Sequence, residues 1–235
     1  MKCQPPYRIF TGAIVLLLVQ ITACAQPKEK PFTEMLMQDS CTFLTTGQNN
    51  FFILEPGYQL ILEGKEGKDS VRLVITVLKE TKKIGNVETR VIEENESANG
   101  ETVEISRNYF AFCKQTGSIY YFGEDVDIYK NGKVVNHDGA WAATGNNKPG
   151  VVMPGLILLG SRYYQEIAPG VAMDRAEIIS ATENIKTIAG DFINVLKTEE
   201  TTPLEPKSKD YKLYAPGIGL IKDGNLLLVK YGFIK

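Results

Sequence analysis

The sequence predicts an all-β protein with a single antiparallel domain and a strongly curved sheet, in the form of a half-barrel, barrel or sandwich. Segments rich in β-branched and aromatic residues alternate between apolar and polar positions, and turn dipeptides separate them. No long segment has the apolar period of 3.6 residues that a substantial helix requires. The 235 residues, 43% of them hydrophobic and 23% charged, have the composition of an ordinary globular protein.

The predicted strands follow one another after residue 50. Val71 to Leu78 is β-branched and mostly apolar, Thr102 to Cys113 alternates before it turns aromatic, and Ser118 to Tyr129 alternates again. The later predicted strands are Tyr163 to Ile167, Val171 to Ser180, Phe192 to Thr198, Tyr211 to Tyr214 and Asn225 to Tyr231. One short helix is predicted before them, at Thr33 to Asp39.

Dipeptides that accept positive φ angles mark the predicted hairpin turns. They are Asn99-Gly100, Asn131-Gly132, Asp138-Gly139 and Asp223-Gly224, each typical of a two-residue type I′ turn. Pro169-Gly170 and Pro216-Gly217 have the order of residues that a type II turn favours, and they predict tight corners between strands. The polar stretch Glu93 to Glu101 is interpreted as a solvated hairpin tip.

The N-terminus has the pattern of an export signal. Lys2 and Arg8 precede a short apolar run at 13–19, which is too short for the roughly 18 apolar residues of a membrane span. Ile21-Thr22-Ala23-Cys24 resembles a bacterial lipobox, in which the cysteine is acylated and becomes the first residue of the mature chain. The alternative is ordinary cleavage after Ala25, without a lipid.

These features divide the chain into a lipoprotein signal peptide (1–23), a polar tether (24–31) and an antiparallel β domain (32–235). Loss of the signal removes two basic residues and leaves 24 Lys and Arg against 28 Asp and Glu, a net charge of −4. This balance gives no sign of nucleic-acid binding, and membrane attachment rests on acyl chains rather than on basic residues. We therefore expect an exported protein of the bacterial cell envelope, lipid-anchored in a membrane and facing the periplasm or the cell exterior.

The four cysteines fit this location. Cys3 lies in the signal and Cys24 is the lipid site, which leaves Cys41 and Cys113 in the β domain. Two thiols in an oxidising compartment are candidates for one disulfide, and the alternative is a pair of buried free thiols.

Several stretches together resemble a family of uncharacterised secreted bacterial proteins and lipoproteins of all-β fold. They are Phe51 to Tyr58, Leu62 to Gly64, Tyr121 to Tyr129, His137 to Trp141, Gln165 to Ala172 and Tyr214 to Lys222. The resemblance spans most of the mature chain. It implies the location and the fold, but no activity and no functional residues.

The hairpin around Asn131-Gly132 contains a candidate cation site. A two-residue turn there would pair Asp127 with Asn136 and Asp125 with Asp138, and alternation would place all four side chains on one face of the sheet. Clustered carboxylates and an amide oxygen are ligands that Ca²⁺ prefers, so Ca²⁺ is the cofactor that this hairpin could bind. The alternative is that pairing ends near Asp127 and that the acids are solvated.

The single histidine excludes every site that needs two imidazoles. His137 is predicted on the same face as Glu124, so the two could form an acid–base pair. Because no nucleophile motif accompanies it, the preferred interpretation is a structural histidine at the rim of the hairpin.

Aromatic residues on a curved sheet suggest an apolar binding surface. Tyr109, Tyr121 and Tyr163 are the candidate ligand-facing side chains. The first hypothesis is therefore a non-enzymatic binding protein for an apolar or amphipathic ligand, or for an envelope protein. The alternatives are a structural module without a cavity and, less favoured, a hydrolase that uses the carboxylates near Asp125 and Asp127.

Overall fold

The chain folds into β-strands joined by antiparallel pairing. A computed structural model describes residues 30–234, in which the single helical element is a 3-10 turn, η1, at Gln38–Ser40. The strands are β1 (Phe43–Leu44), β2 (Gly47–Asn49), β3 (Phe52–Leu54), β4 (Tyr58–Glu66), β5 (Asp69–Ile84), β6 (Val87–Ala98), β7 (Glu101–Cys113), β8 (Ile119–Lys130), β9 (Lys133–Asn136), β10 (Trp141–Ala142), β11 (Lys148–Met153), β12 (Arg162–Tyr164), β13 (Glu166–Ile167), β14 (Arg175–Thr187), β15 (Gly190–Thr202), β16 (Glu205–Ala215), β17 (Gly219–Asp223) and β18 (Leu226–Phe233). The predicted all-β antiparallel fold is confirmed.

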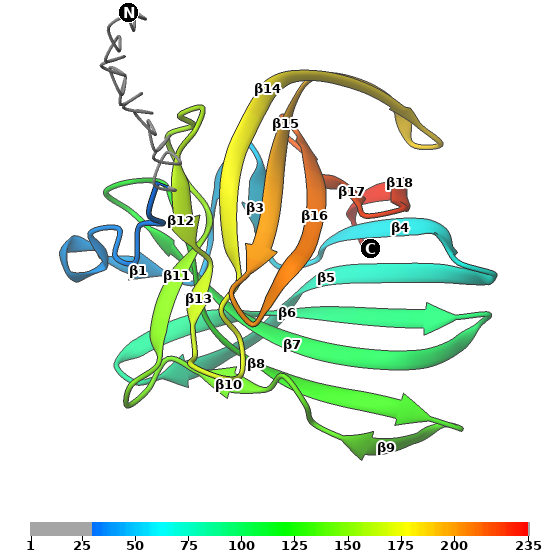
Figure 1. Cartoon of the computed structure of the whole chain (residues 1–235), viewed down its shortest axis with the longest axis horizontal. Coiled ribbons are helices and arrows are strands. Elements are labelled where there is room, and N and C mark those ends of the chain that lie inside the picture. Colours follow the sequence, from blue (N-terminus) through cyan, green and yellow to red (C-terminus); the bar gives the residue numbers. More distant parts are fainter. Residues whose placement is uncertain (1–29, 235) are drawn as a thin grey trace, which may run out of the picture. The chain divides into compact units, whose positions relative to one another are not determined.

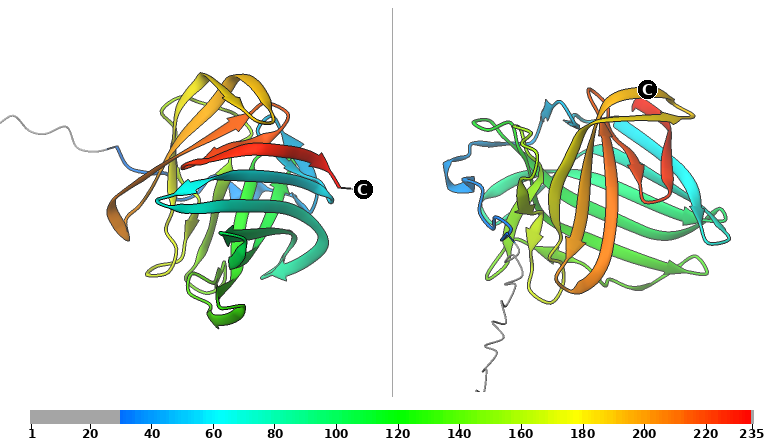
Figure 2. Two further views of the ribbon diagram at one scale, coloured as in Figure 1. Left: turned by 90° about the vertical axis from the view of Figure 1, so that its right-hand side faces the viewer. Right: turned by 45° about the horizontal axis from the view of Figure 1, so that its top comes forward.

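One large sheet runs in the order β12-β14-β15-β16-β17-β18-β4-β5-β6-β7-β8-β11-β13. β1 also pairs with β7, β9 and β10 pair with β8, and β2 and β3 form a separate hairpin. The strands β14–β16 lie across the long strands β4–β8, so the sheet curves into two facing walls (Figures 1 and 2). Apolar side chains from both walls meet in the interior, among them Leu62, Ile92, Leu196 and Leu228.

A single short stretch, Arg162–Ile167, supplies both end strands of this sheet. β12 pairs with β14, β13 pairs with β11, and only Gln165 separates β12 from β13. The Gln165 amide donates a hydrogen bond to the Asp174 carbonyl at 2.8 Å, which extends the contact with the chain before β14. The sheet is therefore nearly closed into a barrel, and the predicted strand Tyr163 to Ile167 is the segment that closes it.

Gly150 permits this closure. A Cβ atom at this position would lie 2.4 Å from backbone atoms of Tyr164 and Gln165, far inside van der Waals contact. The backbone of β11 can approach the closing stretch only because residue 150 has no side chain.

Most of the predicted turns form. Asn99 and Asn131 have φ angles of 52° and 53°, followed by glycines at 86° and 72°, in the two-residue turns that join β6 to β7 and β8 to β9. Pro169-Gly170 and Pro216-Gly217 are each bracketed by a hydrogen bond between residues three apart. Gly170 and Gly217 have the positive φ angles, 79° and 73°, that the third residue of a type II turn requires.

Two predicted turns and the predicted helix are wrong in detail. Asp223 pairs with Leu226, so that turn consists of Gly224 and Asn225. The turn at Asp138-Gly139 joins β9 to β10, which both pair with β8 and not with each other. In place of the helix over 33–39, Thr33 forms a parallel bridge with Tyr163, and a single 3-10 turn, η1, follows at Gln38–Ser40 in this part of the described chain.

The signal peptide, the acylation of Cys24 and most of the tether fall on residues 1–29, outside the described residues. The domain that contains the sheet begins as a compact unit at Pro31. In the part of the chain that the structure describes, no helix has the length and apolar character needed to cross a membrane.

Candidate functional site

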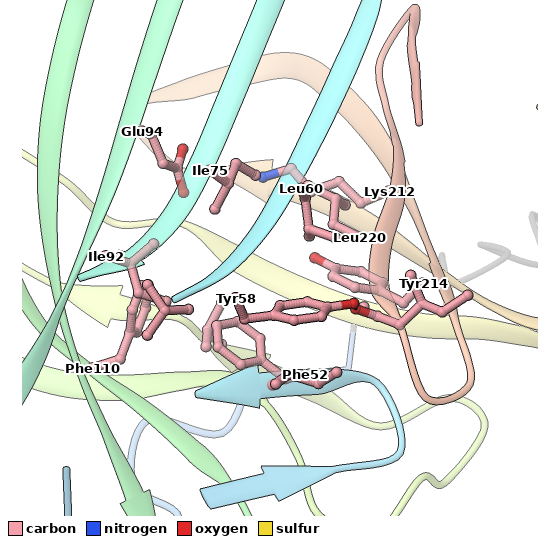
Figure 3. A pocket seen from close by; sticks show the side chains of 15 residues that line it. Phe52, Tyr58, Leu60, Ile75, Ile92, Glu94, Phe110, Lys212, Tyr214 and Leu220 are labelled. Carbon is pink, nitrogen blue, oxygen red and sulfur yellow. The ribbon is translucent and has the colours of Figure 1, made fainter. Parts of the chain in front are cut away.

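An apolar pocket of about 90 Å³ lies inside the barrel. Most of its wall is aliphatic or aromatic, and one carboxylate and one amine border it (Figure 3). The lining residues are Phe52, Ile53, Tyr58, Leu60, Ile75, Val77, Ile92, Glu94, Phe110, Val152, Lys212, Tyr214, Ile218, Gly219 and Leu220. The pocket is smaller than the roughly 150 Å³ cavity that holds a benzene molecule, so it fits a short apolar group rather than a complete acyl chain.

Strand alternation places these side chains in the interior. Ile92 and Glu94 are two residues apart on β6 and therefore point to the same, inward face, as do Lys212 and Tyr214 on β16. Glu94 and Lys212 enter the pocket from opposite walls, and the Lys212 amine extends toward the Glu94 carboxylate (Figure 3).

A second cavity of about 230 Å³, the carboxylate cavity, adjoins the apolar pocket. Its lining is rich in acidic side chains: Glu94, Glu104, Glu124, Glu166, Asp174 and Glu200. The two cavities share Glu94, Phe110, Val152 and Lys212, so one continuous interior passes from apolar to acidic. Among the described residues, Lys212 is the one basic residue that lines the carboxylate cavity.

Lys212 forms an ion-pair network at this boundary. Its Nζ lies 3.1 Å from Glu200 Oε2 and 3.7 Å from Asp223 Oδ2. Burial disfavours the charged form of the amine, but the carboxylates of Glu200 and Asp223 outweigh it and raise the pKa of Lys212 well above its usual value. The lysine therefore stays protonated inside the barrel.

Two of the cavity carboxyls have pKa values near neutrality. Burial raises the pKa of Glu94 to about 7, and the charge of Lys212 lowers it only in part. Burial also raises the pKa of Glu124 to about 7, with a further contribution from Glu94. The net charge of the cavity therefore changes across the neutral pH range.

Glu166 is held deeper in the wall. Its side chain is buried, and Oε1 accepts a hydrogen bond from the Asp174 amide at 2.5 Å. Burial and the neighbouring Asp174 carboxylate raise the pKa of Glu166 well above its usual value, which favours a neutral carboxylic acid.

The three tyrosines predicted to face a ligand have different positions. Tyr121 lines the carboxylate cavity, stacks on Phe110 and donates its hydroxyl to Asn108 Oδ1 at 2.5 Å. Tyr109 and Tyr163 are buried and line neither the apolar pocket nor the carboxylate cavity. The Tyr109 hydroxyl instead donates a hydrogen bond to Asp125 Oδ2.

The pocket aromatics that the prediction missed are Phe52, Tyr58, Phe110 and Tyr214. Tyr58 and Tyr214 lie far apart in the chain and meet because the two walls face each other. No pairing signal in the sequence specifies that approach.

The predicted cation site does not form. A bulge between Tyr129 and Ile128 shifts the pairing, so that Ile128 lies opposite Asn136 and β9 ends there. Asn136 then accepts a hydrogen bond from the Asp138 backbone amide, as in a local turn. Among residues 30–234, no group of three or more acidic, histidine or cysteine side chains is placed to hold a metal ion.

Basic side chains from β5 and β7 pair with the two aspartates of the predicted cation site. Lys82 Nζ lies 2.7 Å from Asp125 Oδ2, and Arg107 lies 3.6 Å from Asp127 Oδ2. The prediction considered only the β8–β9 hairpin, whereas Arg107 pairs directly opposite Asp125 from β7. Both carboxylates are thereby compensated, which argues against the hydrolase built on them.

His137 is an exposed residue at the end of the hairpin. Its Nδ1 lies 2.7 Å from the Val126 carbonyl and 3.0 Å from Asp127 Oδ1. It contacts these groups rather than Glu124, which points into the carboxylate cavity. The arrangement corresponds to the structural interpretation and does not provide the acid–base pair.

Cys41 and Cys113 form a disulfide with a Cα–Cα separation of 5.2 Å. The bond joins the segment before β1 to the end of β7, where Phe43 already pairs with Cys113. It therefore fixes the N-terminal segment of the domain to the barrel wall.

The acidic residues of the interior are not predicted from the sequence. The stretch interpreted as a solvated tip contains Glu94 and Glu96, both of which belong to β6. Glu96 pairs with Glu104 across β6 and β7, on the same inward face as Glu94. Their position two residues apart was a usable signal, because in a strand it puts both on one face.

Comparison with known proteins finds no matching family model, no similar curated protein and no similar solved structure.

Proposed function

We propose that the protein is an exported, lipid-anchored protein of the bacterial cell envelope that binds an amphipathic ligand inside the barrel without chemically converting it. The observation that carries this proposal is the shared boundary of the apolar pocket and the carboxylate cavity, at Glu94, Phe110, Val152 and Lys212. A ligand with a short apolar group and a polar end would match both parts.

The polar lining indicates which ligand ends are favoured. Within residues 30–234, six carboxyl groups and a single lysine line the carboxylate cavity. Hydrogen-bond donors and positive charge are therefore stabilised there, and anions are repelled. The export signal and the lipobox at Cys24 support the envelope location.

The proposal is tested by direct binding. The chain from residue 24 with Cys24→Ser, which carries no lipid anchor, is purified without detergent, and co-purified small molecules are identified by native mass spectrometry. Alkylamines, alkyl alcohols and alkyl sulfates of equal chain length are then titrated calorimetrically. We expect amines to bind more tightly than alcohols, and sulfates not to bind.

Glu94→Gln tests the site itself. The substitution should weaken amine binding about tenfold and leave alcohol binding nearly unchanged, because it removes charge and keeps shape. Glu93→Gln is the matched control, since Glu93 is the neighbouring residue on the other face and pairs with Arg107 at 3.1 Å. If nothing co-purifies and no amphiphile binds at millimolar concentration, the alternative of a structural module replaces this proposal.

A further inference from the structure

The loop between β11 and β12 exposes large apolar side chains on an ordered backbone. We call residues 154–161 the leucine loop. Leu156, Leu158 and Leu159 are 70%, 57% and 67% exposed. The loop contains no charged residue. Such a concentration of exposed leucine on one surface is typical of an interaction site.

The backbone of the leucine loop is fixed by hydrogen bonds. The Gly155 amide donates to Ser118 Oγ at 3.1 Å, and the Gly160 amide donates to the Ile178 carbonyl at 2.7 Å. Ile157 packs against the core while its neighbours point outward. The leucines are therefore held in the exposed position by the fold.

Two methionines extend the apolar surface. Met35 and Met37 are 53% and 69% exposed, and they belong to the segment that leads into the barrel. That segment starts at Thr33, whose amide donates a hydrogen bond to the carbonyl of Arg162. Arg162 is the first residue after the leucine loop. The segment passes Leu36, whose carbonyl accepts the Tyr120 hydroxyl.

Tyr120 connects this segment to the strand that enters the leucine loop. It pairs with Val151 on β11, three residues before the loop begins. The methionine segment and the leucine loop thus occupy the same side of the domain (Figure 1).

The chain before the domain determines what this surface faces. Eight residues lie between Cys24 and Thr33, so the two are at most about 30 Å apart when the chain is extended. Phe32 fixes the end of this span, because the guanidinium groups of Arg162 and Arg175 lie 4.0 and 4.4 Å from its ring centre. An acyl group on Cys24 would keep Thr33, which bonds the Arg162 carbonyl directly after the leucine loop, within that distance of a bilayer.

We propose that the leucine loop, together with Met35 and Met37, is a membrane-contact surface that inserts into the headgroup region of the bilayer. The uncharged loop and its leucines suit the boundary between headgroups and acyl chains. The proposal rests on the proposed acylation of Cys24 for the orientation of the domain, but the surface itself binds lipid without an acyl group.

The test uses the mature chain from residue 24 with Cys24→Ser, which carries no lipid, and phosphatidylcholine vesicles. Partitioning is measured by vesicle flotation. We expect Leu156→Asn/Leu158→Asn/Leu159→Asn to lower the partition coefficient at least tenfold. The control Ile188→Asn/Ile193→Asn/Leu204→Asn removes three exposed apolar residues outside the loop and should change it by less than twofold. Circular dichroism and thermal melting show that each variant is folded.

A tryptophan placed at Leu158 gives a second measurement. The emission of Trp141 in the parent chain is subtracted to give the signal of the added tryptophan. Vesicles of brominated phosphatidylcholine should quench the signal of Leu158→Trp. They should not quench the signal of Leu204→Trp. Equal partitioning of the variants, no partitioning at all, or an unquenched Leu158→Trp signal overturns the proposal. So does a dimer in solution that only the leucine variant abolishes, because the surface would then bind a second copy.

Failure of the acylation proposal is recognised separately, from the intact mass of the protein extracted from membranes. A chain without the added acyl mass on Cys24 contradicts the anchor and leaves the vesicle result unaffected.

Discussion

Lys212 and Glu200 form an ion pair, with 3.1 Å between Nζ and Oε2, at the point where the apolar pocket meets the carboxylate cavity. The pair joins the adjacent strands β15 and β16, and Asp223 on β17 adds a second carboxylate. Three consecutive strands of one wall are thus connected by a single amine.

Lys212→Met should destabilise the fold by about 3 kcal/mol, because it leaves Glu200 and Asp223 close together without a cation. Urea denaturation at pH 7 measures this loss. Lys186→Met is the control, since Lys186 pairs with Asp191 on the surface and should cost well under 1 kcal/mol. Equal losses in the two variants would show that the interior ion pair contributes no more to the free energy of unfolding than the surface pair does.

Stability should fall as the pH rises from about 4.5 to 7. The folded-state pKa values of Glu94 and Glu124 are about 7, above the value of about 4.3 in an unfolded chain. The folded state therefore binds more protons in this interval, and the stability that these groups contribute is complete below pH 4.5 and lost as the pH passes 7.

Glu94→Gln removes the contribution of Glu94 to the pH dependence of stability. Between pH 4.5 and 8 the variant should lose about 2 kcal/mol less than the wild type, as measured by denaturant titration at each pH. Glu93→Gln, on the outer face, serves as the control. A wild-type curve that runs parallel to the Glu94→Gln curve would contradict the assignment of this carboxyl.

Removal of the Cys41–Cys113 disulfide should cost about 4 kcal/mol, because the bond closes a long loop with a sequence separation of 72. The double variant Cys41→Ser/Cys113→Ser is compared with the wild type by guanidinium denaturation, with and without a reductant. The wild type should lose stability on reduction, whereas the variant should not respond. A wild type indifferent to reductant would refute the structural role of the bond.

Gly150→Ala should destabilise the barrel by about 2 kcal/mol, because the added methyl group meets the backbone of the closing stretch at 2.4 Å. Gly67→Ala is the comparison, since a Cβ atom there has no atom within 4 Å and only its φ angle of 59° opposes the change. Amide hydrogen exchange localises the effect. Faster exchange in β11 and β12 in Gly150→Ala alone is the expected result.

The sequence was sufficient for the features that depend on neighbouring residues. Asn99-Gly100 and Asn131-Gly132 adopt the predicted turns because their φ angles are set within the dipeptide itself. Alternation located β5, β7, β8, β15 and β18, and it located β14 and β16 with bounds that differ by several residues. It did not predict β4, β6, β11 or β17.

Features that depend on distant strands could not be predicted in the same way. The register of β8 and β9 depends on a bulge at Tyr129 that no local pattern specifies. Glu94 resembles a surface residue in sequence, and only the approach of β16 from the opposite wall makes it part of a cavity. The basic residues near Asp125 are Lys82 on β5 and Arg107 on β7, and both lie outside the hairpin that contains Asp125.

The bridge between Thr33 and Tyr163 has a mechanical consequence. The Thr33 amide donates a hydrogen bond to the Arg162 carbonyl, and the Thr33 carbonyl accepts one from the Tyr164 amide. The N-terminal segment is therefore hydrogen-bonded to β12 on both sides of Tyr163. Tension applied through the N-terminal end would therefore reach β12 before any other strand. β12 belongs to the stretch that closes the sheet. Under tension the barrel would therefore open at this stretch and expose the carboxylate cavity to solvent, while the long hairpins stay paired.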